Sequence, residues 1–398
     1  MLGEHVHGWE PLISRSPAQH AERGVDVRLR TEVVAIDTGR REVHWREREN
    51  GREGREGFDR LVYATGAGEF RPGLPGIDLG HFVYTPWQAQ HLGEALPGVR
   101  HAVIVGGGYI GLEMAESLLR RGATVEMVAR SPQVMRRTFD ADMATHVQQA
   151  LESDGVRVHC GTTLTGISAH GSRFIAHTEG ATGPGEIETD LVVMGLGSRP
   201  RSGLAAQAGI PLGETGAVAV DHRQETRVEG IYAAGDCAEA WHRVQERWVN
   251  VHLGTIANKA GRVAGINLSG GEARFPGILG TAISRVCETE AARTGISETE
   301  AAALGIAVRS RQIESSTMAG YMPEATPMWV KLVAEEDSGR LLGGQIVGGP
   351  GAAKRIDTLA AAITGRLTVQ DLIDMDLAYA PPFSGVWDPV QTAARVLV

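Results

Sequence analysis

A glycine-rich turn between a strand-like and a helix-like segment constrains the fold of this chain more than any other feature. Residues 101–128 have the sequence HAVIVGGGYIGLEMAESLLRRGATVEMV, in which an apolar run ends at a GxGxxG pattern formed by Gly106, Gly108 and Gly111. In such a unit the first glycine makes the turn, the second lets a pyrophosphate approach the backbone, and the third lets the helix pack on the strand. The helix N-terminus presents free N–H groups to the phosphates. The pattern predicts dinucleotide binding, and the alternative is a glycine turn of purely structural use.

The composition is typical of a globular protein with more than one domain. The chain has 398 residues, of which 42% are hydrophobic and 22% charged, enough for roughly two or three domains. The net charge of −9 argues against nucleic acid or an anionic membrane as a partner. No apolar run is long enough to span a bilayer, and the first residues show no signal-peptide pattern. Cys160, Cys237 and Cys287 match no CxxC or zinc spacing, so we expect no metal site and a cytoplasmic protein.

The first half of the chain contains a strand-rich segment followed by an α/β segment. Residues 25–64 include the strand-like runs VDVRL, TEVVAID and REVHW, then a polar stretch with glycines, and then the buried strand of FDRLVYATGA. The proline–glycine linker FRPGLPGIDLG marks a boundary. Residues 85–211 follow, and there we expect a helix over 140–153 and a buried strand at DLVVMGLG.

The second half shows a different order of elements. An apolar run at residues 230–234 ends at Gly235 and Asp236, and the helix-like GTIANKAGRVAGINL follows. From Gly280 onward the pattern favours an antiparallel sheet. Helices are expected after this sheet, at residues 353–365 and 368–375. This last segment is an α+β domain of ordinary domain size.

Four motifs together resemble a known enzyme family. They are YATGA at residues 63–67, GGGYIGLE at 106–113, YAAGDC at 232–237 and AYAPPFSGVWDPVQTAA at 378–394. The set resembles the flavin-dependent pyridine nucleotide–disulfide oxidoreductases, and the last motif resembles their single-cysteine branch, which includes CoA-disulfide reductase, NADH oxidase and NADH peroxidase. The resemblance implies an α/β fold with tandem Rossmann-like FAD and NAD(P) domains and a C-terminal α+β dimerisation domain.

The resemblance also implies domain ranges. Residues 1–84 would be a remnant of the first part of the FAD-binding domain, and residues 85–211 the NAD(P)-binding domain. Residues 212–279 would be the second part of the FAD-binding domain, and residues 280–398 the dimerisation domain. The protein would then be a homodimer.

For FAD, the resemblance assigns two turns and one helix start. Asp236, after Gly235, would hydrogen-bond the ribityl chain, because a carboxylate accepts from sugar hydroxyls. The alternative is a turn aspartate that caps a helix. The helix start would face the flavin pyrimidine and stabilise its anionic reduced form. The FAD-binding residues implied by the resemblance are Thr65, Gly66, Gly235, Asp236, Leu253, Gly254 and Thr255.

For NAD(P), the resemblance assigns the residues around the fingerprint. Tyr109 resembles the gate residue that nicotinamide displaces, and Glu113 resembles the carboxylate beside the nicotinamide. The alternatives are a core aromatic residue for Tyr109 and a solvated helix residue for Glu113. The NAD(P)-binding residues implied are Gly106, Gly108, Tyr109, Ile110, Gly111, Arg130 and Gly197.

The end of the second strand predicts which nucleotide is used. An acidic residue there would bind the 2′-hydroxyl of NAD, but by the family spacing Ala129 takes that place. Arg130 follows, and Arg136 and Arg137 come soon after, so cations are available for a 2′-phosphate. We therefore expect NADPH rather than NADH, and the alternative is that Arg130 is a solvated loop charge.

Tyrosines near the C-terminus resemble residues of the substrate site. Tyr321 and Tyr379 resemble tyrosines that approach a disulfide substrate, with Tyr379 contributed by the partner subunit. Their hydroxyls would donate to a thiolate or peroxide oxygen. The alternative for both is a packing or interface role. Phe383 and Trp387 are expected in the dimer core.

One departure from the family separates the functional hypotheses. Family members begin with a first GxGxxG unit and a redox cysteine, and residues 1–24 contain neither; about one βαβ unit, on the order of 60 residues, is not found. The first hypothesis is an FAD-dependent NAD(P)H oxidoreductase that reduces a disulfide, oxygen or peroxide. The second is a truncated, non-catalytic, nucleotide-binding dimer with little or no FAD. A third, a ferredoxin- or rubredoxin-reductase-like enzyme, is disfavoured by the YAPPFSGVWDP tail.

Overall fold

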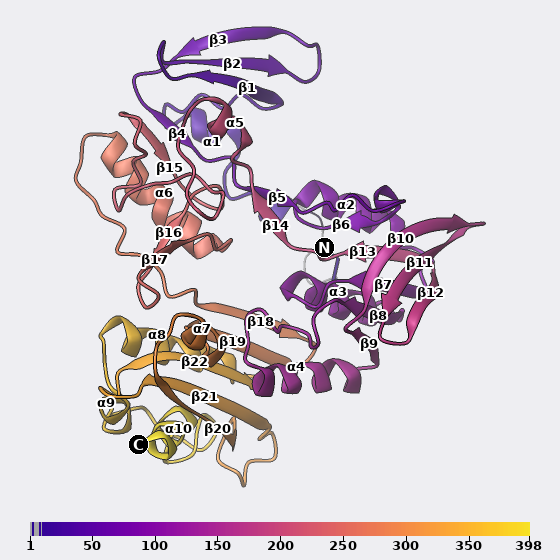
Figure 1. Ribbon diagram of the computed structural model, residues 1–398, viewed down its shortest axis with the longest axis vertical. Helices are drawn as coiled ribbons and strands as arrows, with labels where there is room; N and C mark the ends of the chain where they lie inside the picture. Colours follow the sequence, from indigo (N-terminus) through magenta and orange to yellow (C-terminus); the bar gives the residue numbers. More distant parts are fainter. Residues whose placement is uncertain (1, 4–7, 9) are drawn as a thin grey trace. The chain divides into compact units, whose positions relative to one another are not determined.

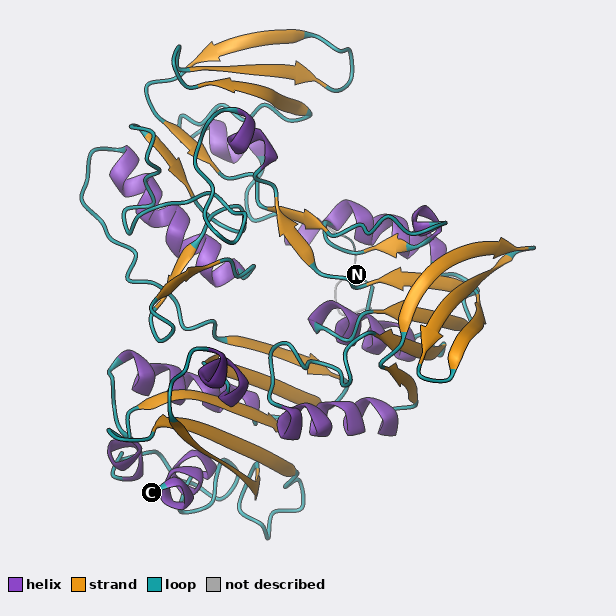
Figure 2. Cartoon of the chain, viewed as in Figure 1, coloured by secondary structure: helices purple, strands orange, loops and turns teal. Residues whose placement is uncertain are grey.

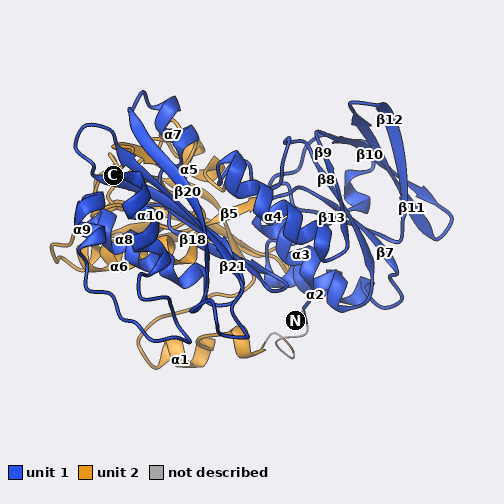
Figure 3. Ribbon diagram, turned by 90° about the horizontal axis from the view of Figure 1, so that it is seen from below, with its two compact units in different colours: residues 1–5, 69–197, 279–398 blue, residues 6–68, 198–278 orange. Residues whose placement is uncertain are grey.

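The computed structural model describes residues 2–3, 8 and 10–398, and the chain divides into two compact units (Figure 3). The first unit comprises residues 1–5, 69–197 and 279–398, and the second comprises residues 6–68 and 198–278. The N-terminal stretch in which no signal peptide is expected lies largely outside the described residues. None of the helices in the described part of the chain combines the length and the apolar character that a membrane crossing requires.

The first half of the first unit is built around a five-stranded parallel sheet (Figure 1). In spatial order its strands are β6 (His81–Phe82), β13 (Leu191–Met194), β7 (His101–Val105), β8 (Thr124–Ala129) and β9 (Val156–Cys160). The inner strands β13 and β7 are nearly continuous apolar runs, as strands buried on both faces require, whereas the edge strand β9 also carries Arg157 and His159. Helices pack on it, namely α2 (Pro86–Ala95), α3 (Tyr109–Arg120) and α4 (Ala141–Ser153), and η2 (Ile77–Leu79) is a short 3₁₀ turn.

A second, antiparallel sheet also covers the parallel sheet. It consists of β10 (Thr163–His170), β11 (Arg173–Gly180) and β12 (Gly183–Thr189). Leu164, Ile167 and Ala176 from this sheet share a buried cluster with Val103 and Val192 of the parallel sheet. The parallel sheet is therefore enclosed, which leaves the carboxyl ends of its strands as the place for a ligand.

The second half of the first unit is the expected α+β domain (Figure 2). Its five-stranded antiparallel sheet has the order β18 (Ala282–Val286), β19 (Thr289–Gly295), β22 (Leu341–Gly348), β21 (Pro327–Glu335) and β20 (Val308–Ser316). Around it lie α7 (Glu298–Ala303), η3 (Ala353–Arg355), α8 (Ile356–Thr364), α9 (Val369–Ile373) and α10 (Pro389–Leu397). Helices α3 and α4 also pack on this sheet, and Val286, Ala291 and Val347 join the core that α3 and α4 bury. The two halves of this unit thus share one core.

The second unit contains smaller sheets. A meander is formed by β1 (Thr31–Asp37), β2 (Glu42–Glu47) and β3 (Glu53–Gly57), and β15 (Ile231–Ala233) pairs in parallel with β4 (Leu61–Tyr63). A hairpin is formed by β16 (Ala240–His242) and β17 (Arg247–Val249). Its helices are η1 (Glu10–Leu12), α1 (Pro17–Ala21), α5 (Gly203–Gln207) and the long α6 (Gly254–Leu268). The short strands β5 (Ala67–Glu69) and β14 (Ser198–Pro200) lie where the chain passes from one unit to the other.

Most expected elements are confirmed, and two are corrected. The run VDVRL is not a strand, because β1 begins only at Thr31 and the preceding Val25, Val27 and Leu29 are exposed. Alternation alone does not make a strand when no neighbour offers backbone hydrogen bonds. Conversely, the polar stretch before FDRLVY forms β3, which pairs with β2. A Cβ on Gly54 would lie 2.3 Å from the Trp45 ring, so this glycine lets the indole pack across the strand.

Candidate functional site

The turn between β7 and α3 has the geometry that a dinucleotide site requires. Gly106 has φ +117°, and a Cβ there would lie 2.2 Å from the carbonyl oxygen of Gly195. A Cβ on Gly111 would lie 2.0 Å from the carbonyl oxygen of Gly106, so this glycine brings α3 against the turn. Around Gly108 a Cβ would meet nothing within 4 Å. The three glycines therefore divide into two that are crowded by backbone and one that faces open space, where a phosphate fits.

The start of α3 offers its N–H groups to a ligand. Gly108 is the N-cap, and no side chain caps the helix. The first-turn N–H groups, which include those of Tyr109 and Ile110, have no partner within the helix itself. An uncapped N-terminus beside an open glycine is suited to bind an anion. The residues present thus fit the pyrophosphate of a dinucleotide.

The loop that follows β8 lies against this turn. Ala129, at the end of β8, is buried, and Arg130 is exposed. The backbone N–H of Met135 donates to the carbonyl oxygen of Gly107 at 2.7 Å, and Met135 has φ +56°. The loop of residues 130–139 is therefore attached to the fingerprint turn, and we call it the arginine loop because it carries Arg130, Arg136 and Arg137.

Tyr109 and Glu113 lie on α3, one turn apart. The ring of Tyr109 packs against the core, and its hydroxyl is buried without a hydrogen bond of ordinary geometry to the described residues. Burial raises the pKa of this phenol, although nearby Arg293 and Thr138 oppose the rise. Glu113 accepts a hydrogen bond from the Ser284 hydroxyl at 3.4 Å. Its pKa is raised, first by desolvation, with the Ser284 hydroxyl opposing the rise.

Gly197 ends the segment that leaves β13. It has φ +86°, it is exposed, and a Cβ there would meet nothing within 4 Å. Its carbonyl oxygen accepts from the backbone N–H of Phe70 at 2.9 Å. Gly197 is therefore free on the side away from this hydrogen bond, as a residue bordering a ligand should be.

In the second unit, Asp236 follows a left-handed Gly235 with φ +84° directly after β15. The side-chain amide of Asn250 donates to the carbonyl oxygens of Asp236 and Ala238, both at 3.0 Å. The Oδ1 of Asn250 lies 2.7 Å from Nε2 of His252, and Nδ1 of His252 lies 2.5 Å from the Ser198 hydroxyl. Burial lowers the pKa of His252, and Asp236 partly offsets that effect.

The helix start that follows this network is uncapped. Leu253 is the N-cap of α6 with no side-chain cap, and Gly254 and Thr255 are exposed in its first turn. The N-terminal partial positive charge of this long helix is therefore available to a ligand that carries negative charge.

The turn of Thr65 and Gly66, after β4, is held by one backbone segment. The Thr65 and Tyr63 hydroxyls donate to the carbonyl oxygen of Arg201 at 2.8 and 2.6 Å, and the Arg201 N–H donates to the carbonyl oxygen of Gly66 at 2.9 Å. Gly66 has φ +66° and open space around its Cβ position. Together with Asp236 and the start of α6, these residues of the second unit fit the flavin end of FAD.

The C-terminal tyrosines come together although they are far apart in sequence. Tyr321 and Tyr379 are exposed, and the pKa of Tyr321 is raised, first by desolvation and then by the phenol of Tyr379. Phe383 is 72% exposed and Trp387 is 47% exposed. Arg395 lies over the Trp387 ring at 4.5 Å from its centroid. This end of the domain therefore presents apolar surface beside the tyrosine pair.

None of the three cysteines is an activated thiol. Cys237 is buried, and its thiol donates to the carbonyl oxygens of Tyr63 and Ala234. Burial raises the pKa of Cys160 and of Cys237, and it raises the pKa of Cys287 to about 12 with help from Asp154. A thiol must ionise to attack a disulfide, so these cysteines are structural at neutral pH.

The sequence predictions missed the residues that position the site. Ser198, Asn250 and His252 hold the Asp236 turn, and Arg201 holds the Thr65 turn. Two of them, Asn250 and His252, stand just before the α6 start in the segment WVNVHLGT. Polar residues directly ahead of a helix that has no capping side chain are the only signal that the sequence offered.

Comparisons with known proteins agree with this geometry. The family described as pyridine nucleotide-disulphide oxidoreductase matches residues 4–255, and its dimerisation domain matches residues 281–390. An NAD(P)H sulfur oxidoreductase (CoA-dependent) of Pyrococcus furiosus is 40% identical over 381 residues, covering 94% of this chain and 84% of the relative. The solved structure of an NAD-dependent persulfide reductase from A. fulgidus has 36% sequence identity to this chain and a TM-score of 0.94. The match covers 99% of this chain and 74% of the reductase.

A third similar protein is an engineered water-forming NADPH oxidase bound to NADPH, a mutant of the NADH oxidase of Lactobacillus brevis. It is 26% identical to this chain with a TM-score of 0.94. The similarity covers 99% of this chain and 87% of the engineered oxidase.

Proposed function

This chain belongs to the pyridine nucleotide-disulphide oxidoreductase family, and we propose that it oxidises NADPH in preference to NADH and reduces a sulfur–sulfur bond. The family is FAD- and NAD(P)H-dependent, and relatives named as NAD(P)H oxidoreductases support an oxidoreductase rather than the alternative of a non-catalytic remnant. The arginine loop is the observation that carries the preference for NADPH. The identity of the sulfur substrate rests on the relatives.

The engineered NADPH oxidase supports the NADPH proposal. Three of its five substitutions are consecutive and introduce alanine, arginine and serine, and a fourth introduces an arginine seven residues after that alanine. This chain naturally has Ala129, Arg130 and Ser131 in that order, and Arg136 follows seven residues after Ala129. The fifth substitution changes a glycine eighteen residues before the new alanine, at the spacing where this chain retains Gly111. Four of the five changes made to accept NADPH are thus already present.

Charge is the physical reason for the proposed preference for NADPH. The buried methyl group of Ala129 offers no carboxylate to repel a 2′-phosphate, and the exposed Arg130 is available to pair with it. Arginine suits this role because its planar guanidinium donates two parallel hydrogen bonds to phosphate oxygens. We propose that Arg130 and Arg136 bind the 2′-phosphate and that Gly106, Gly108, Ile110 and Gly111 hold the pyrophosphate.

Bound FAD supplies the two-electron acceptor for the hydride of the nicotinamide. We propose that Thr65, Gly66, Gly235 and Asp236 bind it together with the start of α6. The uncapped first turn of α6 at Leu253, Gly254 and Thr255 would stabilise negative charge on the reduced ring. In the first unit, Tyr109, Glu113 and Gly197 would border the nicotinamide, where desolvation raises the pKa of the Glu113 carboxyl.

The proposed acceptor is a disulfide or persulfide, such as that of coenzyme A. Relatives named for sulfur and persulfide reduction are 40% and 36% identical to this chain, against 33% for a relative named NADH oxidase and 26% for the engineered water-forming oxidase. Each turnover would oxidise one NADPH, take up one proton and convert one disulfide into two thiols. The two electrons that NADPH gives to bound FAD would cleave the S–S bond of the disulfide, and Tyr321 and Tyr379 would donate hydrogen bonds to the thiolate that is released.

We further propose a cytoplasmic homodimer. The family match to a dimerisation domain and the exposed Phe383 and Trp387 support self-association through the C-terminal domain. Three unpaired cysteines agree with a reducing compartment. The domain ranges 1–84, 85–211, 212–279 and 280–398 are part of the same proposal.

The test compares the two nucleotides on the purified, FAD-loaded enzyme, whose flavin content is first measured by its visible absorption. With coenzyme A disulfide as acceptor, we expect a higher kcat/KM for NADPH than for NADH. Arg130→Ala and Ala129→Glu should each lower the NADPH value by about tenfold or more, because a charge-assisted hydrogen bond is worth about 1.5–3 kcal/mol. Ala129→Glu should also raise the value for NADH. A wild-type preference for NADH would refute the proposal.

A further inference from the structure

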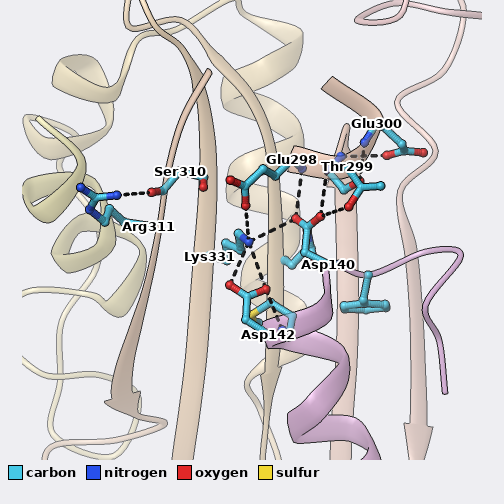
Figure 4. Close-up of polar contacts among 12 residues, drawn as sticks. Asp140, Asp142, Glu298, Thr299, Glu300, Ser310, Arg311 and Lys331 are labelled. Carbon is cyan, nitrogen blue, oxygen red and sulfur yellow. Dashed lines mark hydrogen bonds and ion pairs between the residues drawn. The ribbon is translucent and has the colours of Figure 1, made fainter. Parts of the chain in front are cut away.

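A cluster of polar groups, with Asp140 and Lys331 buried at its centre and Asp142, Glu298 and Thr299 partly exposed around them, connects the arginine loop to the C-terminal domain within the first unit (Figure 4). Its centre is Asp140, the last residue before α4. One carboxylate oxygen, Oδ1, accepts from the Thr299 backbone N–H at 3.0 Å and from the Thr299 hydroxyl at 2.9 Å. The other, Oδ2, accepts from the Gln345 side-chain amide at 2.6 Å and from the Glu298 N–H at 3.0 Å. Asp140 therefore ties the end of the loop to α7 and β22.

A buried lysine supplies the positive charge at the centre of this cluster. Nζ of Lys331 lies 3.4 Å from Oδ2 of Asp140 and 2.8 Å from carboxylate oxygens of both Asp142 and Glu298. The side chains of Lys331 and Asp140 are each only 4% exposed. A buried charge pair holds a defined geometry when hydrogen bonds satisfy both partners. The buried Asp140–Lys331 pair therefore gives a defined position to the groups that hydrogen-bond to Asp140.

The cluster contacts Arg136 through Thr299. The Thr299 hydroxyl donates its proton to Asp140, so its lone pairs are left to accept from other donors. Both terminal nitrogens of Arg136 lie 3.4 Å from this oxygen, and one of them also donates to the Phe139 carbonyl oxygen at 3.2 Å. The guanidinium of Arg136 is thus held by two acceptors.

The arginine loop is fixed on both sides of Arg136. Met135 is bonded to the fingerprint turn through Gly107, as described above. Beyond Arg136, the buried Arg293 of β19 donates to the carbonyl oxygen of Thr138 at 2.8 Å. The backbone of Arg136 therefore has a defined place next to the nucleotide fingerprint, and Thr299 limits where its side chain points.

We propose that Thr299, a residue of the C-terminal domain, positions Arg136 for the 2′-phosphate and so contributes to the selection of NADPH. The inference rests on the proposed NADPH preference. A free arginine side chain loses rotamer freedom when it binds phosphate, whereas one that is already held loses less. Thr299 would act only through Arg136, so its effect should appear with nucleotides that carry the 2′-phosphate and be absent with those that lack it.

The test is calorimetric binding of NADP⁺ and NAD⁺ to the full-length, FAD-loaded protein, which requires no turnover. Thr299→Val keeps the branched shape and removes the hydroxyl. We expect it to weaken NADP⁺ binding by about threefold to tenfold, the cost of ordering one long side chain, and to leave NAD⁺ binding unchanged. Thr299→Ser is the matched control, since it keeps the hydroxyl and should bind both nucleotides like the wild type. In steady-state assays of Thr299→Val, we expect KM for NADPH to rise and kcat to stay constant.

Two further results separate this inference from the function on which it rests. If Arg136→Ala lowers NADP⁺ affinity but Thr299→Val does not, the positioning role is refuted and the NADPH assignment stands. If Arg136→Ala itself does not change NADP⁺ binding, Arg136 is not a 2′-phosphate ligand. Its proposed role in binding and its positioning by Thr299 are then both refuted. In the Arg136→Ala background, Thr299→Val should have no further effect on NADP⁺ binding. An equal loss of NADP⁺ and NAD⁺ binding by Thr299→Val would indicate general damage to the domain and would overturn the inference.

Discussion

Two glycine turns, one in each unit, follow parallel strands but are held in place by different means. After β7, a Cβ on Gly106 would lie 2.2 Å from a backbone oxygen. After β15, the nearest atom to a Cβ on Gly235 would be the Ala257 Cβ at 3.4 Å, an ordinary contact distance. Both glycines have positive φ, of +117° and +84°. The first turn thus needs glycine for space as well as for conformation, whereas the second needs it for conformation alone.

The two turns also differ in the hydrogen bonds that hold them. The first turn is held by backbone hydrogen bonds, from Gly106 N–H to Val128 and from Met135 N–H to Gly107. The second also has backbone hydrogen bonds, from Ala238 N–H to Gly235 and from Val218 N–H to Cys237. It has in addition the support of a side chain, because the Asn250 amide donates to two carbonyl oxygens of the turn. We therefore expect added volume to damage the nucleotide turn more, and the loss of a polar side chain to damage the flavin turn more.

The largest expected effect is that of Gly106→Ala. The new Cβ would collide with backbone that has no room to move, and alanine would adopt an unfavourable φ. We expect a loss of roughly 3–5 kcal/mol in the free energy of unfolding, measured by urea denaturation, and nucleotide binding weakened by at least about a hundredfold.

Gly235→Ala is the matched control for that prediction. It imposes only the conformational cost, so the free energy of unfolding should fall by about 1–2 kcal/mol. If the two alanine variants lose equal stability, crowding does not distinguish the two turns and the comparison fails.

The next effect concerns the support of the arginine loop from the C-terminal domain. Lys331→Met removes the buried cation that faces Asp140, and we expect the free energy of unfolding to fall by about 3 kcal/mol at neutral pH. Asp142 and Glu298 are about half exposed, so their share of this loss is small because solvent screens them. Denaturation of the two proteins in parallel measures the difference.

The pH dependence of that difference checks its origin. Burial raises the pKa of Asp140, but hydrogen bonds from Thr299 and Glu298 and the charge of Lys331 together hold it below its ordinary value of 3.8. A depressed carboxyl pKa stabilises the fold above the ordinary pKa, and this stability is lost as the pH falls through the lower, folded value. The difference in the free energy of unfolding between wild type and Lys331→Met should therefore become smaller below about pH 4. A difference that persists unchanged at low pH would show that the loss comes from packing and not from charge.

Local features of the fold were predictable from the sequence. The helix expected at GTIANKAGRVAGINL is α6 (Gly254–Leu268), and that expected over 140–153 is α4 (Ala141–Ser153), because apolar spacing within one segment determines the buried face of a helix. Strands depend on partners elsewhere. VDVRL lacks a partner in this structure, and the polar β3 has one in β2.

The site residues also divide into those that a local sequence pattern predicts and those that depend on distant parts of the chain. The fingerprint glycines lie within one short segment, so their roles were predictable from spacing. The residues that position the site come from far along the chain: Thr299 bonds Asp140 across 159 residues, and Tyr63 bonds the Arg201 carbonyl across 138. Hydroxyl and amide side chains of this kind have no periodic pattern, so only the folded chain reveals which carbonyl or carboxylate they meet.

A smaller effect is expected for the flavin turn when its side-chain support is removed. Asn250→Ala deletes two hydrogen bonds to carbonyl oxygens, which together should cost about 1–2 kcal/mol of unfolding free energy. The expected functional result is a lower FAD content after purification, read from the visible absorption, with unchanged NADP⁺ affinity. Weakened NADP⁺ binding alongside normal flavin content would contradict the assignment of this turn to FAD.

The smallest expected effect is that of Tyr109→Phe in the nucleotide region. The buried hydroxyl makes no hydrogen bond of ordinary geometry within the described chain, so its removal should leave the free energy of unfolding unchanged or raise it by up to about 1 kcal/mol. Burial raises the pKa of this phenol above its ordinary value of about 10. It therefore stays neutral, and the result should not depend on pH between about 6 and 9.

If the ring of Tyr109 gates the nicotinamide, Tyr109→Phe should also keep the wild-type rate of flavin reduction by NADPH in stopped-flow measurements. Tyr109→Ala, which removes the ring, should change that rate. A clear loss of stability in Tyr109→Phe would mean that the hydroxyl is bonded in solution, most simply to Thr138, which lies beside it. The nucleotide region would then depend on a polar side chain as the flavin turn does, and the contrast between the two regions would be weaker than the structure indicates.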